Sequence, residues 1–205
     1  MSSTINQLIE TRVSTTRYDP SRTLSDSEIA ELVRLATCAP TAYHFQNWKF
    51  IAVRTANAKA RLKVAAYGQQ QVMDASVTFI ICGTLAAHEG LAQVLKPAVE
   101  AGILDNAILA NWVAAATEAH QNNAQLQRDE ALRSASLAAM TLMLAARGMG
   151  LSTGAMGGFD PVVVCSEFGL NATDIPVMLV TAGYPAQGNW PQKPRRPLAE
   201  VMIFA

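Results

Sequence analysis

Two short basic stretches near opposite ends of the chain hold the side chains best suited to bind an anion. The first is TRVSTTRYDP (residues 11–20), in which Arg12 stands close to Ser14, and the second is KPRRP (residues 193–197). A guanidinium or ammonium group beside a hydroxyl and free backbone N–H groups is what a phosphate monoester requires. Each stretch taken alone is more often a solvated surface cluster. A phosphate site is therefore one of two interpretations of either stretch.

A third stretch, LSTGAMGGFDP (residues 151–161), places three glycines ahead of an Asp-Pro pair. Asp160 is a good N-cap and Pro161 suits the first position of a helix, so the glycines lead into a helix N-terminus. Backbone N–H groups without Cβ atoms in the way could receive an anion or an electron-rich planar edge there. The stretch is neither a P-loop nor GxGxxG, and a tight turn without a ligand is an equally good interpretation.

A fourth stretch, APTAYHFQNWKF (residues 39–50), crowds polar and aromatic residues between a helix end and a strand, where a loop could present them to a ligand. The chain has three histidines and no HxxxH or HExxH spacing, so we expect no metal site. It also has no GxSxG, and no group of side chains suggests proton transfer or a nucleophile. Anion anchors and backbone donors without a catalytic side chain suit a cofactor that brings its own reactivity.

The composition is that of a neutral chain of 205 residues, half of them apolar, with 16 basic and 16 acidic side chains. No net positive field exists to hold a nucleic acid. The longest apolar run, residues 135–146, is shorter than the roughly 18 residues that a membrane span needs. The first residues lack the pattern of a secretory signal, and the three cysteines have no disulfide or zinc spacing. We therefore expect a cytoplasmic protein that binds neither membrane nor nucleic acid.

The hydrophobic pattern predicts helices and strands that alternate without a regular βαβ rhythm, which is typical of an α+β domain. Ser25 and Glu28 have the spacing of a capping box. The predicted helices span residues 26–38, 56–67 and 128–147, and a further helix starts at Pro161 and stops at Gly169. The predicted strands span residues 48–53, 77–82 and 177–183, and all are apolar on both faces, as expected of strands covered on both sides. We expect one domain over residues 1–205, with residues 88–128 as a helical excursion.

The order of these stretches resembles the nitroreductase family of FMN-dependent oxidoreductases. The family's opening motif, R-x-S-x-R/K-x-F/Y, matches RVSTTRY, and its turn APSxxNxQPW matches APTAYHFQNW. Its flavin loop matches AMGGFDP and its end matches KPRRPLAEV, while YGQQQVMDAS and VTAGYP stand where the family has similar segments. The resemblance covers nearly the whole chain, and the order of the motifs is more specific than any one of them.

The resemblance implies an α+β fold of three layers, a sandwich in which helices flank a mixed central β-sheet. It also implies an obligate homodimer that binds two FMN molecules, each between the subunits. NADPH or NADH would deliver hydride to FMN N5 and leave, and a nitroaromatic, quinone or flavin acceptor would then take the electrons in the same pocket. In this ping-pong mechanism FMN N5 carries the chemistry, so no catalytic side chain is implied.

Carried residue by residue, the resemblance implies three groups of FMN contacts. The phosphate and ribityl chain would be bound by Arg12, Val13, Ser14, Thr16, Lys193 and Arg195. The flavin ring and its pyrimidine edge would be bound by Gln69, Gln71, Met156, Gly157 and Gly158. From the partner subunit, the same flavin would be reached by Pro40, Thr41, Ala42 and His44. Three positions depart from the family pattern, because Thr16 replaces a frequent Arg or Lys, His44 replaces Asn and Asn47 replaces Pro.

The pocket that receives the acceptor would be lined by Phe45 and Trp112, although apolar aromatic residues are more often core. The same fold also serves reactions in which reduced FMN acts on one specific substrate, such as dehalogenation or flavin breakdown. A flavin-binding redox module without turnover is a third hypothesis, and a helical interaction protein without flavin is a fourth. Flavin content and NAD(P)H consumption distinguish these hypotheses.

Overall fold

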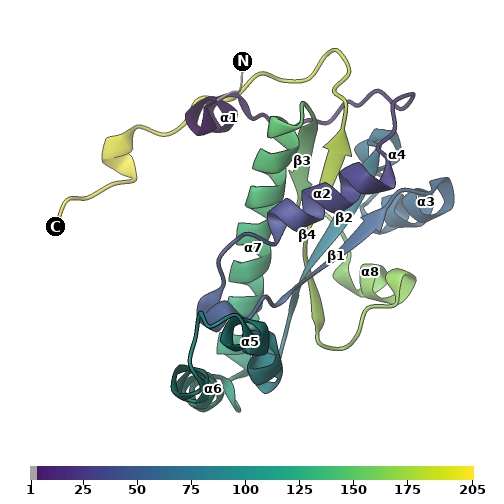
Figure 1. The fold of residues 1–205 in the computed structure, drawn as a ribbon. Coiled ribbons are helices and arrows are strands. Elements are labelled where there is room, and N and C mark those ends of the chain that lie inside the picture. The colour runs from purple at the N-terminus through teal and green to yellow at the C-terminus, as the bar shows by residue number, and fades with distance from the viewer. Residues whose placement is uncertain (1–3) are drawn as a thin grey trace.

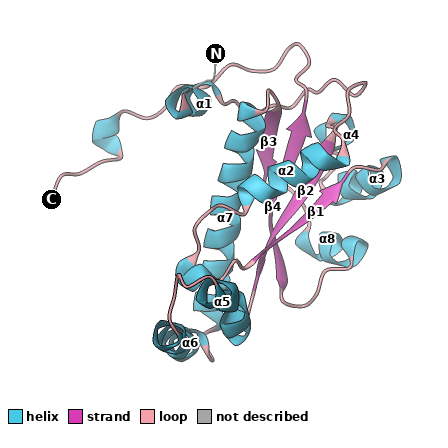
Figure 2. Cartoon of the chain, in the orientation of Figure 1, coloured by secondary structure: helices cyan, strands magenta, loops and turns pink. Residues whose placement is uncertain are grey.

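The computed structural model of the chain describes residues 4–205 and has helices on both faces of one β-sheet (Figure 1 and Figure 2). The strands are β1 (Trp48–Val53), β2 (Val77–Thr84), β3 (Ser152–Met156) and β4 (Asp174–Gly183), in the spatial order β1-β2-β4-β3. One face is covered by α2 (Asp26–Ala36) and α7 (Ala124–Gly148), and the other by α3 (Ala56–Ala65), α4 (Gln71–Asp74) and α8 (Pro161–Phe168). This arrangement confirms the predicted α+β sandwich of three layers.

Strand β2 shows why two helical layers are needed. Phe79 and Ile81 pack into the core that α2 and α7 share with the sheet, whereas Ile80 and Cys82 pack into the core on the side of α3 and α8. Successive side chains of a strand point to opposite faces, and all four of these are fully buried. The apolar character of both faces of this strand, which the sequence predicts, therefore reflects cover on both sides.

The sheet is antiparallel in all three of its strand pairs. Within residues 4–205 the parallel component of the expected mixed sheet is an isolated bridge between Ser14 and Thr153. The N-terminal segment can run beside the edge strand β3 because Gly154 has no side chain. A Cβ atom at Gly154 would lie within 3.0 Å of the Thr15 carbonyl oxygen.

The predicted helices are present, with ends that local hydrogen bonds shift by a few residues. The capping box of Ser25 and Glu28 starts α2, as predicted. Helix α3 ends before Tyr67, which adopts a left-handed φ of 53°. Helix α7 begins at Ala124 rather than at residue 128, because the Asn123 side chain accepts a hydrogen bond from the Leu126 N–H at 3.0 Å and caps an earlier turn.

No strand is predicted for residues 152–156, so β3 is a correction. The sequence Ser-Thr-Gly-Ala-Met lacks the run of β-branched and aromatic residues that marks a strand. Its pairing with β4, from Ser152 opposite Gly183 to Met156 opposite Leu179, supplies what local propensity does not. Strands β2 and β4 are also longer than predicted, and they end at residue 84 and begin at residue 174 respectively.

Residues 88–128 are mostly helical and lie at one end of the sheet (Figure 1). They form most of η2 (Ala87–Gly90), together with α5 (Leu91–Glu100), α6 (Asn106–His120) and the first turn of α7. These helices and η1 (Ala42–His44) enclose a small core of Phe45, Leu91, Leu95 and Ala116. At the opposite end lie α1 (Ile5–Thr11) and a C-terminal arm that contains η3 (Leu198–Glu200) (Figure 1). Within the described range, no helix has both the length and the apolar character that crossing a bilayer demands.

Replacing Gly154 with alanine should lower the free energy of unfolding by about 1 to 3 kcal/mol, the usual effect of overpacking, because the added Cβ atom would collide with the Thr15 carbonyl group. Gly90→Ala is the matched control, since nothing lies within 4 Å of its Cβ position. Urea unfolding of both variants measures the difference. Wild-type stability in Gly154→Ala would contradict the close approach of the two backbones.

Candidate active site

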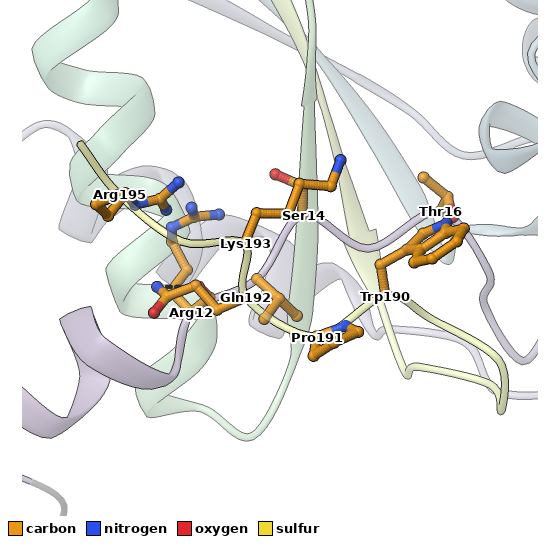
Figure 3. A pocket seen from close by; sticks show the side chains of 9 residues that line it. Arg12, Ser14, Thr16, Trp190, Pro191, Gln192, Lys193 and Arg195 are labelled. Carbon is orange, nitrogen blue, oxygen red and sulfur yellow. Dashed lines mark hydrogen bonds between the residues drawn. The ribbon is translucent and has the colours of Figure 1, made fainter.

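A pocket of about 160 Å³ lies where the two ends of the chain meet (Figure 3). Its wall is formed by Arg12, Val13, Ser14, Thr16, Trp190, Pro191, Gln192, Lys193 and Arg195. All six residues that the family resemblance assigns to an FMN phosphate and ribityl chain are in this wall, although about 180 positions separate the two stretches. In Figure 3, Trp190 stands beside Thr16 at one side, and Arg12 and Arg195 lie at the other.

The N-terminal half of the pocket is held by the edge of the sheet. The Thr15 N–H donates to the Thr153 carbonyl oxygen at 2.9 Å, which buries Thr15 and leaves Ser14 and Thr16 exposed on either side of it. The Tyr18 hydroxyl is buried and lies 2.8 Å from Thr181 Oγ1 and 3.3 Å from the Thr15 carbonyl oxygen. Burial raises the pKa of Tyr18, because a phenolate would lose its hydration there.

The C-terminal half of the pocket follows from the end of β4. Beyond this strand, the Asp19 N–H donates to the Tyr184 carbonyl oxygen at 2.9 Å, and the Ala186 N–H donates to the Arg17 carbonyl oxygen at 3.0 Å. Gln192 Nε2 then donates to the Arg12 carbonyl oxygen at 3.2 Å. The chain is thus guided back across its own N-terminal segment.

The pocket concentrates positive charge without a balancing carboxylate. Arg12, Lys193 and Arg195 have no carboxylate oxygen within 4.0 Å of their cationic nitrogens among residues 4–205. Arg196 differs, because its Nε lies 3.0 Å from a carboxylate oxygen of Glu200. Cations that lie close together repel one another, and a bound anion removes this repulsion. A phosphate can accept charge-assisted hydrogen bonds from several such groups. The pocket therefore has the chemistry of a phosphate site.

A second cluster brings together the residues predicted for the flavin ring. Gln69 Nε2 donates to the Gly158 carbonyl oxygen at 2.7 Å, and Gln71 Nε2 donates to Gln69 Oε1 at 3.2 Å and also contacts Met156 Sδ. Gly157 is exposed, and a Cβ atom on it would meet nothing within 4 Å. This open backbone differs from that of Gly154, whose missing side chain makes room for the chain itself.

Strand β3 joins the two clusters. Thr153 lies beside Ser14 at the pocket, and Gly157 follows the other end of the strand. At about 3.3 Å per residue, four steps along a strand span roughly 13 Å. An elongated ligand with an anionic tail and a flat head could therefore lie along this edge of the sheet, next to the exposed Ala155.

The third predicted group, Pro40, Thr41, Ala42 and His44, does not join the pocket in the same chain. It lies at the other end of the sheet, where Ala42 packs with the core of the helical excursion. The loop is strained, because Tyr43, His44 and Gln46 all have positive φ values, of 49°, 59° and 48°. It is held by the Gln46 N–H, which donates to Thr41 Oγ1 at 3.0 Å.

The two aromatic residues predicted to face an electron acceptor have different surroundings. Phe45 is 3% exposed, and its ring meets the His120 ring edge-on with centroids 5.1 Å apart. Trp112, on α6, is 37% exposed. In one chain, Phe45 therefore anchors the strained loop, and only Trp112 offers its ring to a ligand.

Sequence reasoning missed Trp190, Pro191 and Gln192 as pocket residues, and it also missed Asn189 just before them. The available signal was their place in the sequence. They lie between the turn-forming residue Gly188 and the KPRRP motif, so a turn there would carry them to the same region as the motif. Among residues 4–205, no cluster of three or more His, Cys, Asp or Glu side chains could hold a metal ion.

Comparison with known proteins assigns the chain to a family, since the profile described as the nitroreductase family matches residues 9–184. The chain belongs to the nitroreductase family. YodC of Bacillus subtilis, which bears the name of an NAD(P)H nitroreductase, is 34% identical over 197 residues, or 96% of each chain. This confirms the family that the motifs predict.

Two solved structures named as nitroreductases share the fold of this nitroreductase chain. YdfN of Bacillus subtilis has a TM-score of 0.92 at 28% identity, with 98% of each chain covered. A protein of Exiguobacterium sibiricum, solved in complex with FMN, has a TM-score of 0.93 at 26% identity and covers 100% of this chain and 99% of its own.

Stability at alkaline pH should depend on Tyr18. Because its pKa is raised by folding, its contribution is complete below the pKa of the unfolded chain, about 10, and is lost as the pH rises above that value. Tyr18→Phe should cost about 1 kcal/mol at pH 8 through the lost hydrogen bonds, and should show a shallower loss of stability between pH 9 and 11 than the wild type.

Urea unfolding across this pH range measures the slopes, with the exposed Tyr67→Phe as the matched control. Identical slopes for the wild type and Tyr18→Phe would show that Tyr18 is not the group responsible.

Proposed function

We propose that this chain is an NAD(P)H-dependent FMN oxidoreductase that reduces nitroaromatic, quinone or flavin acceptors by a ping-pong mechanism. The observation that carries the proposal is the edge of β3. At one end are three cations with no carboxylate partner among residues 4–205, and at the other is the open backbone of Gly157. This is the shape and charge of a site for riboflavin phosphate. The FMN in the related Exiguobacterium structure and the NAD(P)H in the name of YodC support the same reading.

The proposed roles of the residues follow from their chemistry. Arg12, Lys193 and Arg195 bind and neutralise the phosphate, and Ser14 offers its hydroxyl to the same group. Gln71 would hold the edge of the flavin ring, and the backbone N–H of Gly157 would donate a hydrogen bond that favours the reduced ring. Bound FMN would supply the redox chemistry, accepting hydride at N5 and passing it on. No side chain needs to move a proton in this scheme.

A second copy of the chain completes the proposed site. The loop of Pro40, Thr41, Ala42 and His44 lies at the other end of the sheet from the pocket (Figure 1), and a homodimer would bring it to the partner's flavin. The C-terminal arm exposes an apolar set that suits such an interface, namely Leu198, Val201, Met202, Ile203 and Phe204. Helix α7 adds the exposed side chains of Leu137 and Met140. The three cysteines are free, as expected in a reducing cytoplasm, where we place this protein.

The direct test is an absorbance spectrum of the purified protein before and after NADPH or NADH is added under argon. The proposal expects a yellow protein that bleaches on addition of the reductant and regains its colour when a quinone or nitroaromatic compound is added. Turnover confined to a defined halogenated substrate would favour the alternative of a specific FMN reaction. A colourless protein that does not bind added FMN would overturn the proposal.

The pair Lys193→Ala and Arg195→Ala should weaken FMN binding, because each charge-assisted contact to a phosphate is worth about 1.5 to 3 kcal/mol. Arg196→Ala is the control on the same arm, since Arg196 is already paired with Glu200 and does not line the pocket. Titration of flavin fluorescence measures the dissociation constants. If the double variant and Arg196→Ala bound FMN equally well, the pocket would not be the phosphate site.

Replacing Ile203 and Phe204 together with Asp should abolish the dimer and reduce the amount of FMN that copurifies. These side chains are 92% and 88% exposed in one chain, so the change should leave the fold of the subunit intact. Sedimentation velocity gives the mass, and Val64→Asp, an exposed position on α3, is the control. A dimer of unchanged stability in the double variant would exclude the arm from the interface.

A further inference from the structure

The side chain of Asn189 joins the two ends of the chain more completely than any other contact at the pocket. Its Oδ1 accepts hydrogen bonds from the backbone N–H groups of Thr16 and Arg17 at 2.9 and 3.0 Å. Its Nδ2 donates to the carbonyl oxygens of Arg17 and Ala186 at 2.8 and 2.9 Å. We infer that Asn189 is a positioning residue that places the cations of the C-terminal arm in the phosphate site.

The amide group is specific for this task. Both donors and both acceptor directions of the Asn189 amide are used, so neither a carboxylate nor a hydroxyl could reproduce the set. Three of the four bonds go to residues 16 and 17, which lie in the same motif, RVSTTRY, as Arg12 and Ser14. The side chain therefore fastens one wall of the pocket to the other.

Asn189 is also the last residue of the chain that is not exposed. Every residue from Trp190 to Ala205 is exposed, and no strand or long helix holds this arm. Beyond Asn189, one hydrogen bond in the described chain ties the arm to the N-terminal wall, from Gln192 to Arg12. The positions of Lys193 and Arg195 thus depend on the four Asn189 contacts and on this one bond, although Asn189 itself does not line the pocket.

The inference rests on the proposed function and adds a residue that carries no charge to the phosphate site. Without the Asn189 hydrogen bonds, the side chains of Lys193 and Arg195 would adopt many conformations. FMN binding would then have to order them, at a cost in conformational entropy. Weaker FMN binding should result, while the flavin ring and its contacts near Gly157 stay as they are. The chemistry of the loaded protein should therefore be unaffected.

The test measures FMN affinity and turnover separately in Asn189→Ala, with the exposed Gln187→Ala as the matched control. We expect the dissociation constant to rise by about tenfold or more, because a charge-assisted contact held in place is worth at least that factor. At saturating FMN, kcat and the KM for NAD(P)H should stay within about twofold of the wild type. Unchanged FMN affinity, or a lower kcat in the saturated variant, would overturn the inference.

A double-mutant cycle with Arg195→Ala tests the mechanism. If Asn189 acts by placing Arg195, the effects of the two substitutions on the dissociation constant should be strongly non-additive. The double variant should then bind FMN only slightly more weakly than the single variant with the lower FMN affinity. Additive effects would show that Asn189 acts independently of Arg195. If Asn189→Ala does not fold, Asn189→Asp keeps the oxygen that accepts from Thr16 and Arg17 and removes both donors, and wild-type FMN affinity in that variant would also overturn the inference.

The failure of this inference can be told apart from failure of the proposed function. If the Lys193→Ala/Arg195→Ala double variant weakens FMN binding and Asn189→Ala does not, the phosphate site is supported and only the positioning role of Asn189 is wrong. If neither the Lys193→Ala/Arg195→Ala double variant nor Asn189→Ala changes FMN affinity, the phosphate site itself is wrong.

Discussion

The close approach of two backbones at Gly154 is the constraint on which the rest of the site depends. Thr15 lies against the edge strand β3 there, and its N–H bonds to Thr153. This contact holds Ser14 beside Thr153 at the wall of the pocket, and the C-terminal arm returns across the same N-terminal segment. A side chain at Gly154 would push the N-terminal segment away from the sheet and separate the two halves of the pocket.

The resulting site has two parts, a cluster of positive charges and a stretch of backbone without side chains. Cations gather where the chain ends cross, and the open glycines lie about four residues farther along the same strand edge. A nitroreductase-family chain needs little more from its side chains, because a flavin brings its own reactivity and the protein supplies binding, orientation and hydrogen bonds. In the proposed mechanism, such a site needs no acid, base or nucleophile from the chain.

The helical excursion has a structural role in this scheme. Its small core buries Phe45 and so holds a loop in which three residues adopt left-handed conformations. Strain of this kind persists only where the surroundings enforce it. The loop is far from its own chain's pocket, and the arm with its apolar residues extends away from the body (Figure 1). Both features are explained if each subunit completes the site of the other.

The sequence by itself determined the family, the layered fold, the cores of α2, α3, α7, α8 and three strands, and six of the nine residues that line the pocket. These follow from local chemistry: caps, apolar periodicity and charged motifs whose order is specific. Only the tertiary structure decided three features: strand β3, the hydrogen bonds of Asn189, and the different surroundings of Phe45 and Trp112. Each of these depends on which distant segment lies alongside. Thr15 against Gly154, or Asn189 against Thr16, is a pairing between positions far apart in the chain, and local propensity contains no information about it.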